Sequence, residues 1–380
     1  MAKLFRITTV PISVEKLLGN QLTYMNGFFD VTAISSSENG NLKRVGEKLN
    51  VKTYSIEMTR QITPLEDLKS LWLMYKYIKK EKPEIVHTHT PKAGLIGMMA
   101  ARLAGVKIRL HTVAGLPLME TSGVKRKILN LVEKLTYSCA TNVYPNSKGL
   151  YNFILDEKLG KPDKIKVIGN GSTNGIDVAN FDPALFSDET KSTLKQSLNI
   201  AKEDFVFVFV GRLVKDKGIN ELVSAFKKLK APKVKLLLVG PYESDLDPLD
   251  ESTLSEIDQN KNILTVGFQK DVRPYFAISD ALVFPSYREG FPNVVLQALA
   301  MGLPAIVSDI NGCNEIITHR ENGIIVPPKN ESSIQEAIVL LLDQAFYAKL
   351  KASARPSIMK YKQEHIWELL KKNYEKLLIS

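Results

Sequence analysis

The sequence predicts an α/β protein made of two doubly wound, Rossmann-like domains that face each other across a cleft. Three observations lead to this fold class. A chain of 380 residues is too long for one compact core and calls for two domains. Strand-like apolar runs alternate with helix-periodic segments, which is the order of a mostly parallel sheet with helices on both faces. The alternation then restarts after Asp177.

The first domain is predicted to span residues 1–180. Its strands are expected at Leu4–Val10, Val31–Ser35, Ile85–Thr88, Ile108–Thr112, Asn142–Pro145 and Lys166–Gly169. Apolar residues recur at helical spacing in the segments between them, most clearly at Pro64–Lys80, Ala93–Ala104 and Lys125–Cys139.

The second domain is predicted to span residues 181–360, after a polar connection that carries Pro183 and a short helix. Its strands are expected at Phe205–Val210, Val234–Val239, Ile263–Val266, Ala281–Phe284, Ala305–Ser308 and Ile324–Val326. A last segment, residues 361–380, has apolar residues near helical spacing and is predicted to be a separate helix.

Composition places the protein among ordinary globular proteins, with 44% hydrophobic and 24% charged residues. Met1–Val10 lacks the layout of a secretion signal, and the longest apolar run, Ala93–Val106, is too short to cross a bilayer. Cys139 and Cys313 are far apart in the sequence. They are therefore expected to be reduced thiols of a cytoplasmic protein.

Positive charge is concentrated in the first half of the chain. Residues 1–180 hold 26 Lys and Arg against 15 Asp and Glu, a net of +11, whereas residues 181–380 hold 25 against 26, a net of −1. Such a basic half could meet anionic lipid or a phosphorylated substrate, or its lysines could simply be solvated. No helix-turn-helix, zinc-ligand spacing or aromatic RNA-binding signature is recognisable, so no nucleic-acid partner is expected.

Two loops of the second domain carry residue types suited to a charged sugar substrate. The first places Glu289 between a buried strand and a helix that starts near Pro292, where free N–H groups suit a phosphate or sugar oxygen. The second follows Phe205–Val210, and in it Arg212 and Lys217 can converge on one diphosphate.

These two loops resemble the donor-site signatures of the retaining glycosyltransferases of family 4, which have the GT-B fold. The resemblance covers most of the chain and is strongest from Gly211 to Pro328. It implies that Arg212 and Lys217 clamp the diphosphate of a nucleotide sugar and that Glu289 holds a hydroxyl of the donor sugar. Further donor contacts are implied for Gly211, Gly290, Phe291, Asn293 and Val294.

One position departs from the family pattern. The family has a second Glu eight residues after the first, and here that residue is Gln297. A glutamine offers one acceptor oxygen and two donor hydrogens, so its bonds to the ribose hydroxyls should be weaker than those of a carboxylate.

The resemblance implies a reaction that keeps the anomeric configuration and needs no metal or other cofactor. The acceptor attacks from the face that the leaving group departs, and Arg212 and Lys217 stabilise the charge on the departing diphosphate. Asp245-Leu246-Asp247 spells the metal-binding motif of other glycosyltransferases. It stands in an acidic loop interrupted by prolines, and we expect it at the surface.

The resemblance also assigns the acceptor to the first domain. Lys92, at a helix start, suits an acceptor phosphate, and Ser13 stands where the family often has a Gly-rich loop. His111 matches a cleft histidine near the donor sugar in related enzymes, although a structural histidine is the alternative. His87 and His89 near a strand end could suggest a metal site, but no carboxylate accompanies them in sequence.

The stretches around His87 and His111 resemble a subgroup that builds bacterial surface polysaccharides on polyprenyl diphosphate-linked sugars. In the family the final helix crosses back to the first domain, and we expect the same of residues 361–380. An anionic membrane is then a second partner, with the protein peripheral on the inner face of the plasma membrane. Ser122–Cys139 could lie on that surface, or could be a core-facing helix with a solvated basic end.

The sequence therefore predicts an enzyme that moves a hexose or N-acetylhexosamine from a UDP-sugar to a polyprenyl diphosphate-linked saccharide in capsule or lipopolysaccharide synthesis. Two other readings stay open. A UDP-sugar epimerase on the same scaffold would process the donor without an acceptor. A non-catalytic polysaccharide-binding protein would use the basic half alone.

Overall fold

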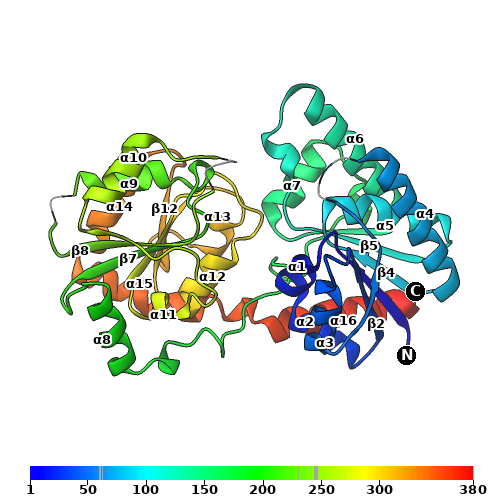
Figure 1. The fold of residues 1–380 in the computed structure, drawn as a ribbon, viewed down its shortest axis with the longest axis horizontal. Coiled ribbons are helices and arrows are strands. Elements are labelled where there is room, and N and C mark those ends of the chain that lie inside the picture. Colours follow the sequence, from blue (N-terminus) through cyan, green and yellow to red (C-terminus); the bar gives the residue numbers. More distant parts are fainter. Residues whose placement is uncertain (60, 62, 230, 244–246, 380) are drawn as a thin grey trace. The chain divides into compact units, whose positions relative to one another are not determined.

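The computed structural model describes residues 1–59, 61, 63–229, 231–243 and 247–379. The chain divides into two compact units. The first unit joins Met1–Gly175 to the final segment that begins at Gln363, and the second unit is Ile176–Lys362. Each unit is a doubly wound α/β domain, in which helices cover both faces of one parallel sheet (Figure 1).

The first unit is built on a six-stranded parallel sheet with the order β3-β2-β1-β4-β5-β6. Its strands are β1 Lys3–Ile7, β2 Asp30–Ser35, β3 Lys52–Ser55, β4 Ile85–Thr88, β5 Ile108–Val113 and β6 Asn142–Pro145. Its helices are α1 Pro11–Ser13, α2 Asn20–Asn26, α3 Asn41–Leu49, α4 Pro64–Glu81, α5 Pro91–Leu103, α6 Gly123–Cys139, α7 Lys148–Asp156 and α16 Gln363–Ile379.

Helices cover both faces of this sheet and bury a separate core on each. Figure 1 shows α4, α5 and α6 on one side of the sheet and α2, α3 and α16 on the other. Because side chains alternate along a strand, Phe5 and Ile7 of β1 enter the core under α4 and α5, whereas Leu4 enters the core under α16. The last helix is therefore part of the first unit's hydrophobic interior.

The second unit repeats the arrangement with the strand order β12-β11-β10-β7-β8-β9, all parallel. Its strands are β7 Phe205–Val210, β8 Val234–Val239, β9 Ile263–Thr265, β10 Ala281–Phe284, β11 Ala305–Ser308 and β12 Gly323–Val326. Its helices are α8 Asp188–Ser197, α9 Ile219–Lys227, α10 Glu251–Gln259, α11 Arg273–Ala277, α12 Asn293–Ala300, α13 Cys313–Ile316, α14 Glu331–Leu341 and α15 Gln344–Ser357.

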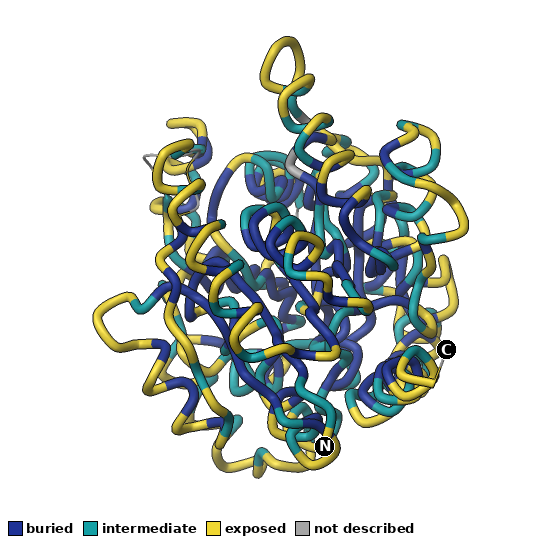
Figure 2. Tube along the Cα trace, turned by 90° about the vertical axis from the view of Figure 1, so that its right-hand side faces the viewer, coloured by how far each residue is buried: buried dark blue, intermediate teal, exposed yellow. Residues whose placement is uncertain are grey.

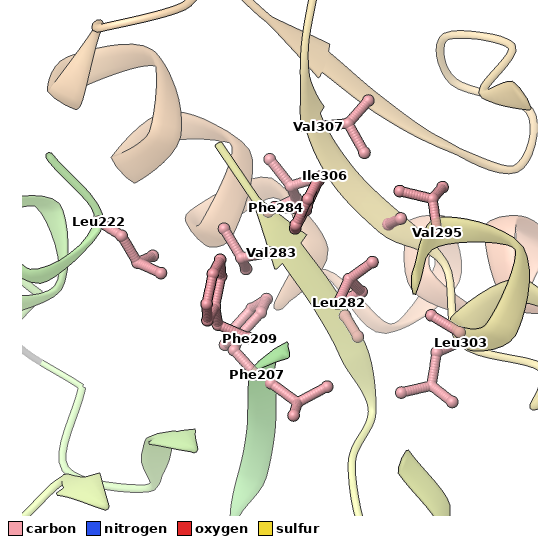
Figure 3. Close-up of a cluster of buried hydrophobic side chains, with 14 of the residues drawn as sticks. Phe207, Phe209, Leu222, Leu282, Val283, Phe284, Val295, Leu303, Ile306 and Val307 are labelled. Atoms are coloured by element: carbon pink, nitrogen blue, oxygen red, sulfur yellow. The ribbon is translucent and has the colours of Figure 1, made fainter. Parts of the chain in front are cut away.

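The central strands of the second unit are buried on both faces. Figure 3 shows Phe207 and Phe209 of β7 beside Leu282 and Val283 of β10, with Val295 of α12 packed nearby. Figure 2 shows buried segments through the interior and exposed residues along outer helices and loops. A buried core of this kind holds the two loops that follow β7 and β10 in fixed positions.

One predicted strand is absent, one observed strand was not predicted, and the strand predicted at Leu4–Val10 ends at Ile7. Residues 166–169 form no strand, because the pairing with β6 stops after a single bridge between Ile165 and Val143. The sequence also gave no prediction for β3, whose residues are mostly exposed at the edge of the sheet. Its polar side chains lack the apolar alternation that marks a half-buried strand.

The expectation of free thiols agrees with the structure. Cys139 and Cys313 are both free and buried. No helix among the described residues is both long and apolar enough to span a bilayer.

Candidate active site

The loop between β10 and α12 places Glu289 in a compact, charged cluster. The Nζ of Lys217 lies 2.6 Å from Oε1 of Glu289, and the side chains are only 14% and 18% exposed, respectively. The hydroxyl of Ser286, a fully buried residue, donates to the same Glu289 oxygen at 3.0 Å. One carboxylate oxygen thus receives an ammonium and a hydroxyl, and the cluster joins both loops that the sequence singled out.

The loop after β7 is held against this cluster by a close backbone approach. Lys215–Lys217 form one tight turn that ends at Gly218, whose φ is +71°. A Cβ at Gly218 would stand 2.2 Å from the carbonyl oxygen of Pro285. The backbone N–H of Tyr287 also donates to the carbonyl of Asp216 at 2.9 Å. Only glycine lets the two loops meet here, which brings Lys217 to Glu289.

Arg212, the other predicted clamp residue, makes a different ion pair. Its Nη1 lies 2.7 Å from Oε2 of Glu243, and both side chains are partly exposed. The two cations follow the same strand, but each is bonded to its own carboxylate. Contact of Arg212 and Lys217 with one diphosphate stays a prediction.

The acidic loop after β8 holds the backbone of the loop after β7 through a hydrogen bond. Asp247 is half-buried and accepts a hydrogen bond of 2.6 Å from the backbone N–H of Asp216. Asp245, the first acidic residue of the predicted surface motif, lies outside the described residues. Within the described residues, no group of three or more His, Cys, Asp or Glu side chains is placed to hold a metal ion.

The start of α12 presents the remaining predicted donor residues. Pro292 is the N-cap, so the helix begins one residue later than a proline at its first position would give. Asn311 ties the preceding loop down by donating to the carbonyls of Glu289 and Gly290 at 3.0 and 2.8 Å. On the helix, Asn293 is exposed, and Val294 and Gln297 are half-buried on the same side. Gly211, at the end of β7, lies at the same carboxyl edge of the sheet.

Phe291 and Cys313 are two buried residues of this region. The ring of Phe291 lies 5.4 Å from the ring of Tyr361 and is nearly buried. Burial, with a smaller effect from the charge of Glu289, raises the pKa of the Cys313 thiol well above its usual value. A neutral, buried thiol does not act as a nucleophile.

Lys92 of α5, predicted to bind an acceptor phosphate, is paired within its own unit. Its Nζ lies 2.6 Å from both carboxylate oxygens of Asp67 on α4. Both side chains are largely buried. An acceptor phosphate would have to replace or share Asp67 as the anion on this lysine.

His111 of β5 lies beneath α5 and is almost completely buried. Its Nδ1 is 2.7 Å from the hydroxyl of Thr88, and a Cβ on Gly94 would stand 2.5 Å from its Cε1. Burial lowers the pKa of His111 to about 4, so the ring is neutral near pH 7. Its contact with the donor sugar stays a prediction.

His87 and His89 have protein partners. The ring nitrogens of His87 bond to the hydroxyls of Tyr374 and Thr112 at 2.5 and 2.8 Å. The Nε of Arg6 donates to Nε2 of His89 at 2.9 Å. Burial lowers the pKa of both histidines well below the usual value. The bond from Tyr374 ties α16 to β4, and all three bonds favour a structural role over a metal site.

Ser13 lies in α1, the short helix that follows β1. Its side chain is half-buried, and its backbone N–H donates to the carbonyl of Val10 at 3.0 Å. The place of the family's Gly-rich loop is therefore a helical turn, and acceptor contact by Ser13 stays a prediction.

Sequence reasoning missed three partners that shape the site: Ser286, Glu243 and Asp67. Ser286 stands inside the Glu289 loop, but a serine three residues before a glutamate carries no signal of its own. Glu243 and Asp67 lie 31 and 25 positions from the cations that they pair with. No spacing rule for helices or turns connects residues so far apart.

Comparison with known families matches both units. The profile described as "Glycosyl transferases group 1" matches residues 190–357, and the profile described as "Glycosyl transferase 4-like domain" matches residues 24–171. Together the matched segments contain Glu289, Lys217, Arg212, Lys92 and His111.

Similar proteins agree in fold and class. The capsular polysaccharide biosynthesis glycosyltransferase CapM of Staphylococcus aureus is 35% identical over 380 residues, covering 99% of this chain and 97% of CapM. An Escherichia coli UDP-Gal:alpha-D-GlcNAc-diphosphoundecaprenol alpha-1,3-galactosyltransferase is 32% identical over 310 residues. The match covers 80% of this chain and 77% of the E. coli enzyme. The structure of Anabaena HepE in complex with UDP and glucose superposes with a TM-score of 0.81 at 17% identity. The superposition covers 99% of this chain and 100% of HepE. This likeness confirms the predicted GT-B fold.

Proposed function

The chain belongs to the group 1, family 4-like glycosyltransferases, and from that premise we propose that it transfers a hexose or N-acetylhexosamine from a UDP-sugar to a polyprenyl diphosphate-linked saccharide. The transfer retains the anomeric configuration and needs no metal. One observation carries the proposal, the Lys217–Glu289–Ser286 cluster at the carboxyl edge of the second sheet. Parallel α/β sheets bind ligands at that edge.

The cluster suits a leaving diphosphate beside a sugar hydroxyl. Breaking the bond between sugar and diphosphate places negative charge on the phosphate oxygens, and a fixed ammonium stabilises that charge. Lys217 supplies the ammonium, and partly exposed Arg212 supplies a guanidinium that can exchange Glu243 for a phosphate. Two protein cations then do the work that a divalent ion does in other transferases.

Retention is supported by what Glu289 is bonded to. A carboxylate oxygen that receives an ammonium at 2.6 Å and a hydroxyl at 3.0 Å is poorly placed to take a proton or attack carbon. Glu289 can instead accept a hydrogen bond from a sugar hydroxyl through its other carboxylate oxygen, Oε2. The acceptor's proton then passes to a leaving phosphate oxygen.

The acceptor belongs to the first unit in this proposal. The printed name of the E. coli relative gives that protein a UDP-linked donor and a diphosphoundecaprenol-linked acceptor. Lys92 supplies a cation at the start of α5, with Ser13 and His111 as further contact candidates. The net charge of +11 over residues 1–180 suits both a diphosphate and an anionic membrane surface.

Helix α6 supports a peripheral position on the inner face of the plasma membrane. Its exposed apolar residues Val124, Ile128, Leu131 and Leu135 recur at spacings of four, three and four, which places them on one face. The opposite face buries Glu133 and Tyr137. The helix is thus core-facing and also exposes an apolar stripe with lysines beside it, as an interfacial helix does.

Donor turnover tests the proposal directly. Purified protein would be incubated with EDTA, a panel of UDP- and GDP-sugars and a polyprenyl diphosphate-linked sugar, beside Glu289→Ala. We expect UDP release that requires the acceptor, survives EDTA and falls at least about 100-fold in the variant. The anomeric configuration of the product, read by NMR, should match that of the donor.

A matched control is Glu256→Ala, because Glu256 of α10 also pairs with a lysine, Lys227 of α9, and is similarly buried, but lies outside the cluster. This variant should keep normal turnover. Isomerisation of a UDP-sugar without acceptor, an inverted product, or loss of activity with EDTA that added metal restores would each contradict the proposal.

A further inference from the structure

Helix α4 exposes a second apolar face, on a segment for which the sequence analysis predicted a helix and no functional role. Leu65, Leu68 and Trp72 are 85%, 64% and 53% exposed. Their spacing of three and four residues places them on one side of the helix. The opposite side carries Ser70, Met74 and Ile78, which are buried. The exposed face is therefore surplus to the packing of the first unit.

From this face we infer that α4 is a second membrane contact, which together with α6 seats the first unit on an anionic lipid surface. The inference rests on the proposed function only in that a lipid-linked acceptor gives the contact its purpose. The binding itself requires neither donor nor acceptor.

Basic residues continue the same face toward the end of α4. Lys69, Lys76 and Lys79 fall on the helix side of Leu65 and Trp72 at helical spacing, and all three are exposed. The Nζ of Lys76 lies 3.4 Å from the centre of the Trp72 ring. Tryptophan and lysine side by side on an apolar stripe are typical of the water–lipid boundary, where the ring enters and the ammonium stays outside.

The basic end of α4 also borders a groove of about 740 Å³. Lys79, Lys82 and Lys107 line it together with apolar side chains that include Ile78 and Val106. Glu84 also lines the groove, and three lysines against one carboxylate, with apolar side chains between them, suit the phosphate of an anionic lipid and the start of its chain. This charge favours a lipid surface over an apolar protein partner.

The position of α4 links the contact to the acceptor. Asp67 lies in the same first turn of α4 as Leu65 and Leu68, on the side turned away from them, and bonds to Lys92, which we propose for the acceptor phosphate. The turn of α4 that begins the apolar face thus also holds that lysine. Helices α4 and α6 both pack on α5 (Figure 1), and each of them exposes an apolar stripe. A bilayer under both stripes brings a lipid-borne diphosphate near the start of α5.

Vesicle binding of the full chain tests the inference. Wild-type protein would be sedimented with phosphatidylcholine vesicles that contain 30% phosphatidylglycerol, without donor or acceptor. We expect Leu65→Ser/Leu68→Ser/Trp72→Ser to reduce the partition coefficient at least about tenfold. Lys69→Gln/Lys76→Gln/Lys79→Gln should reduce binding to these vesicles and leave the weak binding to pure phosphatidylcholine unchanged.

The matched control removes exposed apolar residues from the second unit, Leu185→Ser/Val339→Ser. It should bind as wild type does. Trp72 gives a direct reading, because Trp367 is nearly buried and the emission of Trp72 should shift to the blue on vesicles. Unchanged circular dichroism and thermal melting would confirm that the α4 variants fold.

Three results would overturn the inference: wild-type partitioning of the triple serine variant, an equal loss in the control, or a wild-type dimer that the serine variant dissociates while vesicle binding stays the same. A water-soluble, short-chain prenyl diphosphate acceptor separates this proposal from the proposed function. The α4 variants should turn it over normally, whereas absence of transfer in the wild type with intact vesicle binding would contradict the proposed function alone.

Discussion

Lys217 is the residue at which the two loops of the candidate active site meet. Replacement by methionine keeps most of the side-chain length and removes the ammonium, which leaves Glu289 with Ser286 as its bonded neighbour. We expect kcat to fall about 100- to 1,000-fold, because one donor to the developing diphosphate charge is lost. Steady-state kinetics with a UDP-sugar would measure the change.

Lys215→Met is the control for that variant. Lys215 stands two residues earlier, is about half exposed and pairs with Asp250 at 3.3 Å outside the cluster. Its kcat should remain within about twofold of wild type, as surface ion pairs contribute little. Equal losses in the two variants would show that general positive charge, rather than the position of Lys217, supports turnover.

Gln297 tests the ribose contact. Gln297→Glu restores a carboxylate on the half-buried side of α12 and should strengthen bonds to ribose hydroxyls by about 1 kcal/mol, which lowers KM for the UDP-sugar up to about fivefold. Binding of UDP alone, measured by calorimetry, should tighten equally. A rise in KM would mean that the side chain of Gln297 donates a bond that a carboxylate cannot make.

Residues that follow a strand could be placed from the sequence, and their partners could not. Glu289 and Lys217 were found because a proline- or glycine-broken loop after an apolar run marks the edge of a parallel sheet. Which carboxylate each cation meets depends on how two loops pack in space. Glu243 and Asp67 were therefore visible only in the structure.

At the scale of elements, Gly218 sets how closely the β7 and β10 loops approach. Gly218→Ala would force the Cβ into the carbonyl of Pro285 at 2.2 Å, so the loop that holds Lys217 must shift. Gly302→Ala is the matched control, because its φ is +80° and no atom outside its chain neighbours lies within 4 Å of an added Cβ.

Both alanine variants bear the strain of a left-handed backbone, about 1–2 kcal/mol. Gly218→Ala should lose a further 1–3 kcal/mol or so through the steric clash, measured as the free energy of unfolding in urea. Equal losses of stability in the two variants would mean that the β10 loop moves away from the added Cβ at no cost in free energy.

Strand predictions succeeded where burial is strongest. Val206, Phe207, Val208 and Phe209 of β7 are all fully buried, and a strand covered on both faces reads as one continuous apolar run. β3 lies at the edge of its sheet with little burial, so its Lys-Thr-Tyr-Ser sequence carries no such pattern. Residues 166–169 contain apolar residues and still form no strand, because their pairing with β6 ends at the single bridge of Ile165, and Gly169 then turns the chain away with a positive φ of 57°.

At the scale of the whole molecule, acid should unfold the first unit before the second. His87, His89 and His111 are buried in the first unit, whereas His319 in the second unit is exposed. Burial lowers the pKa of all three, to about 4 for His111. Folding keeps these rings neutral, so the stability present above about pH 6.5 is lost as the pH falls and the unfolded chain takes up protons. For His111 the loss is complete near pH 4 and is about 3 kcal/mol.

Glu133 acts in the opposite direction, since burial raises its pKa to about 7 and its protonation favours the fold as the pH falls from about 7 to 4.5. Three histidines outweigh one glutamate, so the net effect of acid is a loss of stability of the first unit.

Both tryptophans, Trp72 and Trp367, lie in the first unit, so their fluorescence reports on that unit alone. Fluorescence should change at a higher pH than the remaining helical circular dichroism signal; one coincident transition would contradict this order.

The return of α16 to the first unit has a consequence for synthesis on the ribosome. The second unit is one continuous stretch, Ile176–Lys362, but the first unit needs residues that are made after all of it. Tyr374 and Trp367 fill its core, and Tyr374 bonds to His87. The unit that emerges first thus finishes folding only after the second unit has been made, and a growing chain must keep an uncovered apolar sheet face from aggregating until α16 has emerged.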